Sequence, residues 1–222
     1  RHLLFLLLTL SSTASFFSQE KKEIIANRTN NPPKIDGILN DELWKSLPAV
    51  SEFNMFEPGN EGLISQEYQT LVKMAYDDNA VYIAVYMFDP NPDKILRQLS
   101  QRDEVFVQAD LFYVALNTLN DGINETRFYV TSAGTIGDSK NSQNEEDFNY
   151  NVVFDCKTSI DTKGWYAEYK IPYNSYGAPP LSPTKRYMIL SYRDSVCVRN
   201  FKTGELFKKI KKLEEKSNAL NE

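Results

Sequence analysis

Histidine is nearly absent from this sequence of 222 residues. The single example, His2, lies in an N-terminal segment that we expect to be removed from the mature chain. This scarcity excludes a Ser-His-Asp or Cys-His arrangement, a histidine-rich zinc site and a histidine general base. The two cysteines, Cys156 and Cys197, are too few for a four-thiolate zinc site. They could form a disulfide in an oxidising compartment or be two buried small hydrophobic residues, and both interpretations stay open.

The chain also lacks a surplus of positive charge. Its net charge is −5 and its pI is about 5.1, which argues against a nucleic-acid partner because phosphate binding needs a basic surface. Near the C-terminus a basic cluster is followed by Glu214 and Glu215, which favours a solvated helix face over a membrane surface. The cluster consists of Lys208, Lys209, Lys211 and Lys212.

Long hydrophobic runs are missing as well, except at the N-terminus. There an apolar run at 2–10 follows a positive residue and precedes small and polar residues at 11–18. This order predicts a secretory signal peptide over 1–18, with a buried N-terminal helix as the alternative. The run is far shorter than the ~20 residues of a transmembrane helix. We expect no membrane span in the mature chain, a flexible lead-in at 19–31, and an exported protein that is periplasmic, outer-membrane-associated or extracellular.

Aromatic residues, in contrast, are abundant: 13 Tyr and 13 Phe stand beside 2 Trp. Tyr and Phe favour strands and also build sugar-binding faces, and packing a β core accounts for most of them. Residues 141–147 form a polar, acidic segment that indicates a loop. Short alternating or apolar runs recur between turn residues, which predicts strands at 70–76, 81–88, 110–116, 126–131, 151–158, 165–171 and 187–192.

The pattern of these elements indicates an all-β protein. Residues 81–88 are apolar on both faces, so we expect their hairpin with 70–76 to be central and covered on both sides. One short helix is predicted at 41–47, with Asn40 as its N-cap. The tail at 202–222 carries apolar residues at roughly helical spacing, which predicts a C-terminal helical tail. Many short strands with local turns predict an antiparallel sandwich or barrel.

Five motifs, in order, resemble those of family 9 carbohydrate-binding modules. The first is the family's opening motif of Ile-Asp-Gly, a Leu, an acidic pair and Trp, which 33–44 match as Pro-Lys-Ile-Asp-Gly-Ile-Leu-Asn-Asp-Glu-Leu-Trp. Each motif alone is weak, and five at sensible spacing are fairly specific for the fold. The others resemble later strands and turns: 80–85 with Asp89 and Pro92, Arg102-Asp103 with 110–117, 128–130 with 133–138, and 164–168 with 171–173.

The resemblance implies a jelly-roll or immunoglobulin-like β-sandwich at 32–193, with 194–222 as a truncated or divergent tail. It is strongest with a subgroup found N-terminal to a large domain of unknown function in Bacteroidetes-type cell-envelope proteins. This implies that the sequence is a fragment lacking that C-terminal domain. In function it implies a non-catalytic module of an exported protein that binds a polysaccharide or oligosaccharide and takes part in carbohydrate catabolism.

The resemblance also guides the choice of binding residues. In sugar-binding members a Trp shortly precedes the position of Asp110, a Glu occupies that of Tyr113 and an Arg that of Tyr129. This chain offers Phe106 and two tyrosines instead. Because Tyr can both stack on a sugar ring and donate a hydrogen bond, we expect a different site. The candidate carbohydrate-binding residues are Arg102, Phe106, Tyr113, Tyr129, Tyr150 and Asn151.

Some of these residues have a structural interpretation too. Arg102 can pair with Asp103 or read sugar hydroxyls, and both readings are open. Tyr150 can present an exposed platform or face inward. We interpret Phe154 and Trp44 as packing residues.

Asparagine and aspartate crowd one loop, and their oxygens could hold Ca²⁺, which takes roughly six to eight hard ligands. Calcium is also common in the family that the sequence resembles. The spacing matches no EF-hand, and side-chain turns explain the composition more simply. The candidate calcium ligands are Asn117, Asn120, Asp121 and Asn124.

Two other functions stay open. The chain could be a structural or docking domain without sugar affinity, its aromatics serving packing alone. It could also belong to a glycoside hydrolase, which needs two carboxylates. Glu67, Glu104, Asp110 and Glu168 are candidates, but nothing marks a pair. We expect this chain to be no enzyme, and any hydrolysis to belong to an absent partner domain.

Overall fold

The computed structural model describes residues 24–55, 62–117, 123–143 and 145–176, and the backbone of three further strands at 187–192, 195–200 and 206–210. The helices are α1 Glu42–Ser46 and three 3-10 turns, η1 Gln66–Tyr68, η2 Pro92–Lys94 and η3 Tyr173–Tyr176. The strands are β1 Asn27–Arg28, β2 Thr70–Tyr76, β3 Ala80–Phe88, β4 Leu111–Leu116, β5 Glu125–Thr131, β6 Ile136–Ser142, β7 Glu145–Asp147, β8 Asp155–Asp161, β9 Gly164–Pro172, β10 Tyr187–Tyr192, β11 Ser195–Asn200 and β12 Leu206–Ile210.

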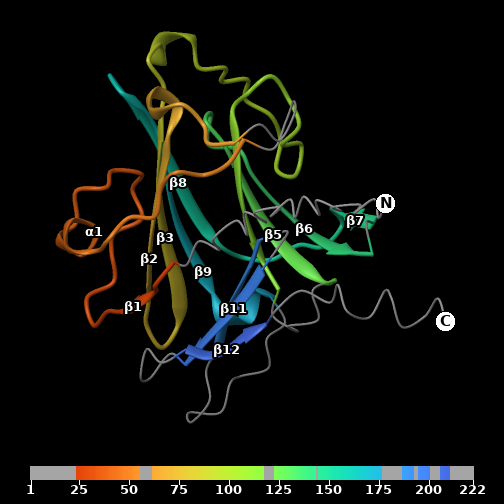
Figure 1. The fold of residues 1–222 in the computed structure, drawn as a ribbon. Coiled ribbons are helices and arrows are strands. Elements are labelled where there is room, and N and C mark those ends of the chain that lie inside the picture. The colour runs from red at the N-terminus through yellow and green to blue at the C-terminus, as the bar shows by residue number, and fades with distance from the viewer. Residues whose placement is uncertain are drawn as a thin grey trace, which may run out of the picture.

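These strands form two sheets that lie face to face as a sandwich (Figure 1). One sheet is five-stranded, in the order β1-β2-β3-β9-β8, and the other is seven-stranded, in the order β12-β11-β10-β4-β5-β6-β7. Neighbouring strands are antiparallel, apart from the short parallel pair of β1 and β2. The predicted all-β sandwich is confirmed.

Strand β3 runs through the middle of the five-stranded sheet, between β2 and β9. Successive strand residues point to opposite faces, so Val81, Ile83 and Val85 enter the core between the sheets. Tyr82 and Ala84 point to the outer face and are covered there as well. All five side chains are at most 2% exposed. The prediction of a central hairpin covered on both sides is therefore confirmed.

Aromatic rings from both sheets meet in the core. Phe154, just before β8, stacks on Tyr169 of β9 with ring centroids 6.3 Å apart and 10° between the planes. It also meets the edge of Phe128 from β5, with centroids 5.2 Å apart. All three are at most 5% exposed, which confirms the packing role predicted for Phe154. Burying each such side chain stabilises the fold by about 1.5–3 kcal/mol.

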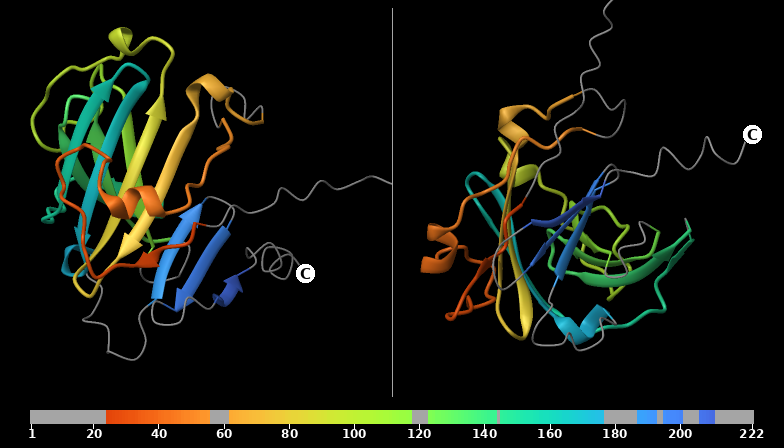
Figure 2. Two further views of the ribbon diagram at one scale, coloured as in Figure 1. Left: turned by 90° about the vertical axis from the view of Figure 1, so that its left-hand side faces the viewer. Right: turned by 60° about the horizontal axis from the view of Figure 1, so that its bottom comes forward.

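The segment before β2 lies across the outer face of the five-stranded sheet, with α1 against β2 and β3 (Figure 2). One buried carboxylate fastens it. Glu168 of β9 accepts hydrogen bonds from Trp44 Nε1 (2.6 Å) and from the backbone N–H groups of Asp36 and Gly37 (3.0 Å each). Burial raises the pKa of the Glu168 carboxyl, and these three hydrogen bonds oppose the rise. Trp44 is 1% exposed and has the structural role predicted for it.

Gly37 allows this segment to approach the sheet closely. Its φ is +82°, and a Cβ placed on it would lie 2.9 Å from the backbone carbonyl carbon of Thr158 in β8. Only glycine avoids both the left-handed strain and the clash. The helix that follows is one residue shorter at each end than predicted, and its N-cap is Asp41 rather than Asn40.

The polar segment at 141–147, predicted as a loop, contributes to two strands, β6 and β7. Strand β6 lacks apolar alternation because its buried residues Asp138 and Ser139 hydrogen-bond to neighbouring segments instead of packing apolar surface. Hydrophobic periodicity therefore gave no signal for it.

The predicted C-terminal helix is wrong for Leu206–Ile210, which forms β12 and pairs antiparallel with β11. The spacing of the apolar residues fits a helix, but pairing with β11 at the sheet edge decides the conformation of this segment. The seven-stranded sheet thus continues beyond the predicted boundary at 193, and β1 lies within the predicted lead-in.

Several expectations concern residues outside the described part of the chain, among them the signal peptide at 1–18 and most of the tail. Cys156 on β8 is a free, buried thiol, and burial raises its pKa well above the usual value. The side chain of Cys197 lies outside the described residues. Within the described ranges, no helix is long and apolar enough to cross a membrane.

Candidate binding site

Four aromatic residues gather on the outer face of the seven-stranded sheet, and we call them the aromatic cluster. Tyr113 of β4 and Tyr129 of β5 are register partners with ring centroids 5.1 Å apart. Phe106, in the loop before β4, and Phe148, just after β7, meet the Tyr129 ring at 5.9 and 5.7 Å and each other at 5.8 Å. The strand neighbours of both tyrosines enter the core, so strand alternation sends the tyrosines outward.

Gly137 of β6 sets the position of Phe106. It is the register partner of Tyr129, and a Cβ on it would lie 2.8 Å from Val105 Cγ1 and 3.1 Å from the Cα of Asp103. The missing side chain lets Val105 pack against the strand, where it is 1% exposed. The next residue, Phe106, is thereby held over the ring of Tyr129.

The members of the cluster differ in exposure. Phe106 is 68% exposed and Tyr113 is 47% exposed, whereas Tyr129 is 1% exposed. The Tyr129 hydroxyl donates to Glu146 Oε1, and burial, followed by this hydrogen bond, raises the pKa of Tyr129 to about 12. Phe106 and Tyr113 therefore present their rings to solvent, and Tyr129 supports them from beneath.

A charged network borders the aromatic cluster. Arg127 Nε lies 3.1 Å from Glu125 Oε2, and Arg127 Nη1 lies 3.1 Å from Glu146 Oε2 on β7. The guanidinium carbon of Arg127 is 5.5 Å from the centroid of the Tyr113 ring, within range of a cation–π contact. Burial alone would lower the pKa of Arg127, and the hydrogen bonds of Tyr129 and Glu125, with the charge of Glu146, more than offset it. The net effect is a raised pKa.

Both oxygens of Glu146 are engaged before any ligand arrives. Oε1 accepts from the Tyr129 hydroxyl and from Ser139 Oγ (2.5 Å), while Oε2 faces Arg127. Such a network fixes the side chains in place, so a ligand would not have to order them.

This arrangement can bind a ring that has an apolar face and polar edges. The exposed rings of Phe106 and Tyr113 offer planes for stacking. A guanidinium carries five N–H donors, and the two ion pairs of Arg127 leave donors directed elsewhere. The side chain of Arg127 is 20% exposed and that of Glu125 is 25% exposed, so both can be reached from solvent.

Of the six candidate binding residues, the structure brings together Phe106, Tyr113 and Tyr129. Arg102 lies on the opposite side of the sheet, where it forms an ion pair with Asp138 of β6 and donates to the carbonyl of Val152 (2.8 Å). Asp138 is fully buried and also accepts from the Val152 N–H (2.8 Å). Arg102 therefore fastens the segment before β8 onto β6, and its contact with Asp103 is long, at 3.8 Å.

Tyr150 and Asn151 also lie away from the aromatic cluster. The Tyr150 hydroxyl donates to the carbonyl of Ser175 (3.3 Å), and the Lys140 ammonium lies 5.7 Å from the Tyr150 ring. Asn151 is exposed, and its amide donates to the carbonyl of Asn149 (3.3 Å). Tyr150 is half-buried, so neither a fully exposed platform nor a core position describes it.

The four candidate calcium ligands are only partly described. Asn117 is buried at the end of β4 and Asn124 is half-buried before β5, while Asn120 and Asp121 lie outside the described residues. In the part of the chain that the structure describes, no three Asp, Glu, Cys or His side chains gather as a metal site. Calcium binding by this loop stays a prediction.

Sequence reasoning missed Arg127, Glu146 and Phe148. A signal existed for Arg127, because it precedes Tyr129 by two positions on a predicted strand and so shares its face. Glu146 and Phe148 lie in or beside the segment predicted as a loop, where no alternation placed them.

Comparison with known proteins finds similarity in structure alone. No family model matches the sequence, and no curated protein matches it. The fold is similar to that of a family 9 carbohydrate-binding module from Caldicellulosiruptor kristjanssonii in complex with glucose, with a TM-score of 0.51 and 15% identity over 84% of this chain and 82% of that chain. A family 9 module from the same organism in complex with cellotriose has a TM-score of 0.50 and 16% identity over 85% of this chain and 81% of that chain. A protein from Bacteroides uniformis, provisionally described as carbohydrate-binding, has a TM-score of 0.50 and 11% identity over 83% of this chain and 85% of that chain.

The likeness to these structures concerns the fold, which is a two-sheet β-sandwich. More narrowly, it is a sandwich like that of family 9, as the sequence motifs predicted.

Proposed function

We propose that this domain is a non-catalytic carbohydrate-binding module whose aromatic cluster binds a sugar ring of a polysaccharide or oligosaccharide. The observation that carries the proposal is the pair of exposed rings, Phe106 and Tyr113, beside the ordered side chains of Arg127, Glu125 and Glu146. A sugar ring stacks its C–H face on an aromatic plane, and its hydroxyls exchange hydrogen bonds with guanidinium and carboxylate groups. The similar folds that hold glucose and cellotriose support this reading.

The environment of the glutamates described above supports a binding role without chemistry. A glycosidase needs one carboxyl group that holds a proton and a second that stays ionised. Glu125 and Glu146 are instead ion-paired to the same guanidinium, and Glu168 is fully buried beneath the N-terminal segment. We expect no hydrolysis from this domain.

In this proposal the domain belongs to an exported protein of polysaccharide catabolism. By binding a polysaccharide it would hold a catalytic partner domain close to the substrate and raise the effective concentration of cleavable bonds. Periplasmic, outer-membrane-associated and extracellular locations all suit this role.

The proposal is tested by titrating the protein with cellotriose and a panel of soluble glycans in a calorimeter. Tyr113→Ala should lower the affinity for the best glycan by about tenfold, because it removes a stacking plane. Arg127→Met should lower it at least as much, because hydroxyl contacts are lost. Tyr68, on η1, is a matched control: it is 42% exposed, and Tyr68→Ala should leave affinity unchanged.

Two results would contradict the proposal. One is a wild-type protein that binds no glycan in the panel. The other is a Tyr113→Ala variant that keeps full affinity while its circular dichroism matches that of wild type. Repeating the panel with and without Ca²⁺ tests the calcium loop separately.

A further inference from the structure

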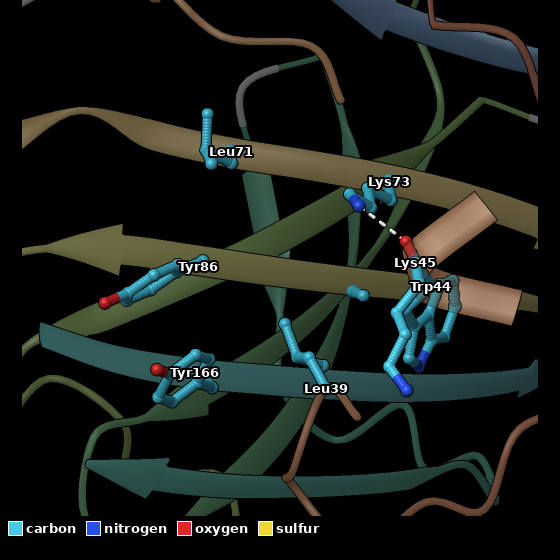
Figure 3. Close-up of a pocket in the computed structure, with 8 residues that line it drawn as sticks. Leu39, Trp44, Lys45, Leu71, Lys73, Tyr86 and Tyr166 are labelled. Atoms are coloured by element: carbon cyan, nitrogen blue, oxygen red, sulfur yellow. Dashed lines mark hydrogen bonds between the residues drawn. The ribbon is translucent and has the colours of Figure 1, made fainter. Parts of the chain in front are cut away.

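A pocket lies on the side of the sandwich opposite the aromatic cluster, on the outer face of the five-stranded sheet (Figure 3). Its volume is about 210 Å³, and no residue of the aromatic cluster lines it. Leu71 and Leu39 form its sides, the rings of Tyr86 and Tyr166 lie at one end, and Lys73 and Trp44 lie at the other (Figure 3).

The register of the sheet explains the hollow. Leu71, Tyr86 and Tyr166 occupy one row across β2, β3 and β9, and Lys73 and Ala84 are partners in the next row. Same-face rows along a strand are about 7 Å apart, and the hollow lies between the tyrosine row and the Lys73 row. Ala84 stands where larger neighbours would fill the space, so its short side chain forms the floor.

The third residue of the second row is acidic, but it takes no part in the pocket. Glu168 is the partner of Ala84 on β9, and it is fully buried and bonded to Trp44, Asp36 and Gly37. The N-terminal segment therefore covers the Glu168 carboxylate, whereas Lys73 of the same row still lines the pocket.

The tyrosine end is a fixed platform. The rings of Tyr86 and Tyr166 stack with centroids 4.3 Å apart and 18° between planes. Both hydroxyls donate to the carboxylate of Asp161 at the end of β8. The oxygen–oxygen distance is 3.5 Å for Tyr86 and shorter for Tyr166. Asp161 holds the rings from outside and does not line the pocket.

The opposite end carries positive charge. Lys73 is half-buried, and its ammonium donates to the carbonyl of Trp44 (2.5 Å), which is its one hydrogen bond within the described residues. An ammonium has three N–H donors, so two of them are left for an anion. Lys45 also lines the pocket and pairs with exposed Glu42 (2.7 Å). No Asp or Glu lines the pocket.

We propose that this pocket is a second saccharide site and that it binds a sugar ring carrying a carboxylate, a uronic acid unit. The ring would occupy the space above Ala84 against the tyrosine pair, and its carboxylate would accept hydrogen bonds from Lys73. Charge-assisted hydrogen bonds are the strong ones, so the carboxylate rather than the hydroxyls sets the preference. The site is independent of the aromatic cluster, so the proposed function and this inference can fail separately.

The test is a calorimetric titration of the whole chain with digalacturonic acid and with cellobiose as its uncharged counterpart. We expect saturable binding of digalacturonic acid that weakens as salt is raised, and at least roughly tenfold weaker binding of cellobiose in this pocket. Lys73→Met, which keeps the apolar stem, should lower digalacturonate affinity by roughly tenfold or more, whereas Lys73→Arg should retain most of it. Tyr68→Ala, which removes an exposed tyrosine outside both sites, is the matched control and should leave digalacturonate affinity unchanged.

Two results would overturn the inference: no binding of digalacturonic acid to wild type, or full affinity in Lys73→Met. Thermal unfolding of each variant shows whether it is folded. Should Lys73→Met fail to fold, Tyr166→Ala supplies the second variant, with the same loss expected and full affinity contradicting the site. Failure of the aromatic cluster to bind any neutral glycan would leave this inference standing if Lys73-dependent binding is observed.

Discussion

The outer faces of the two sheets begin from the same strand alternation and end as different surfaces. On the seven-stranded sheet the outward side chains of β4 and β5 include Tyr113, Tyr129 and Arg127, and two rings of the aromatic cluster stay open to solvent. On the five-stranded sheet the N-terminal segment crosses the outer face and seals most of it around Glu168. One pocket remains where that cover ends, at Tyr86 and Tyr166.

The difference teaches that the chain segments beyond the strands decide what a sheet face can do. Val105 on Gly137 brings Phe106 onto one face, and Trp44 on Glu168 closes much of the other. A core side chain can often be replaced by another apolar side chain of similar volume, whereas these two contacts each need the particular residues at their positions. Removing either contact should therefore change one face and spare the other.

The largest effect is expected from Glu168→Gln. The amide nitrogen replaces one acceptor, so either Trp44 Nε1 or the N–H groups of Asp36 and Gly37 would face a donor. Stability should fall by about 2–4 kcal/mol, measured by urea unfolding. Binding of neutral glycans by the aromatic cluster should persist in the folded fraction. Glu67→Gln, an exposed glutamate on η1, should behave as wild type, and an equally stable Glu168→Gln would show that Glu168 does not fasten the segment.

A smaller effect should appear at alkaline pH through Tyr129, on the opposite face. Its pKa is raised from 10.0 to about 12 in the folded protein, so the unfolded chain ionises first. The resulting stabilisation is complete below pH 10 and is lost as the pH rises through about 12. Between pH ~9 and pH ~12 the free energy of unfolding, measured with urea, should fall by about 2 kcal/mol more in wild type than in Tyr129→Phe. Parallel stability curves for the two proteins would contradict the shift.

The smallest of the three effects on stability is expected from Gly137→Ala. The added methyl would meet Val105, so the loop has to move away from β6. Stability should fall by about 1–2 kcal/mol, and the affinity of the aromatic cluster should fall severalfold because Phe106 leaves its place over Tyr129. Binding in the pocket of the five-stranded sheet should be unaltered. If Gly137→Ala were less stable but its aromatic cluster bound glycans with unchanged affinity, Gly137 would not position Phe106.

The sequence predicted the parts of the fold that a local pattern encodes. The strand at 70–76 was placed at its observed bounds, and apolar residues on both faces placed β3 at the centre of its sheet. The two exposed rings of the aromatic cluster, Phe106 and Tyr113, followed from the family motifs.

The rest depends on partners far apart in the chain. Polar β6 buries Asp138 by bonding it to Arg102 and to the Val152 N–H, and no hydrophobic period marks such a strand. Arg127 and Glu146 meet only because β5, β6 and β7 pair in sequence. The pocket at Lys73 depends on the register of β2 against β3, which is set by the whole sheet.

The bond between Trp44 and Glu168 spans 124 positions of the chain. A ribosome releases the tryptophan long before its acceptor, so the nascent N-terminal segment can pack on β2 and β3 but cannot yet bond to Glu168. Closing so large a loop is costly, and contacts of this separation form late. The part of the domain that is made first is thus fastened last, and a stalled chain ending before β9 would lack the carboxylate that holds Trp44 in place.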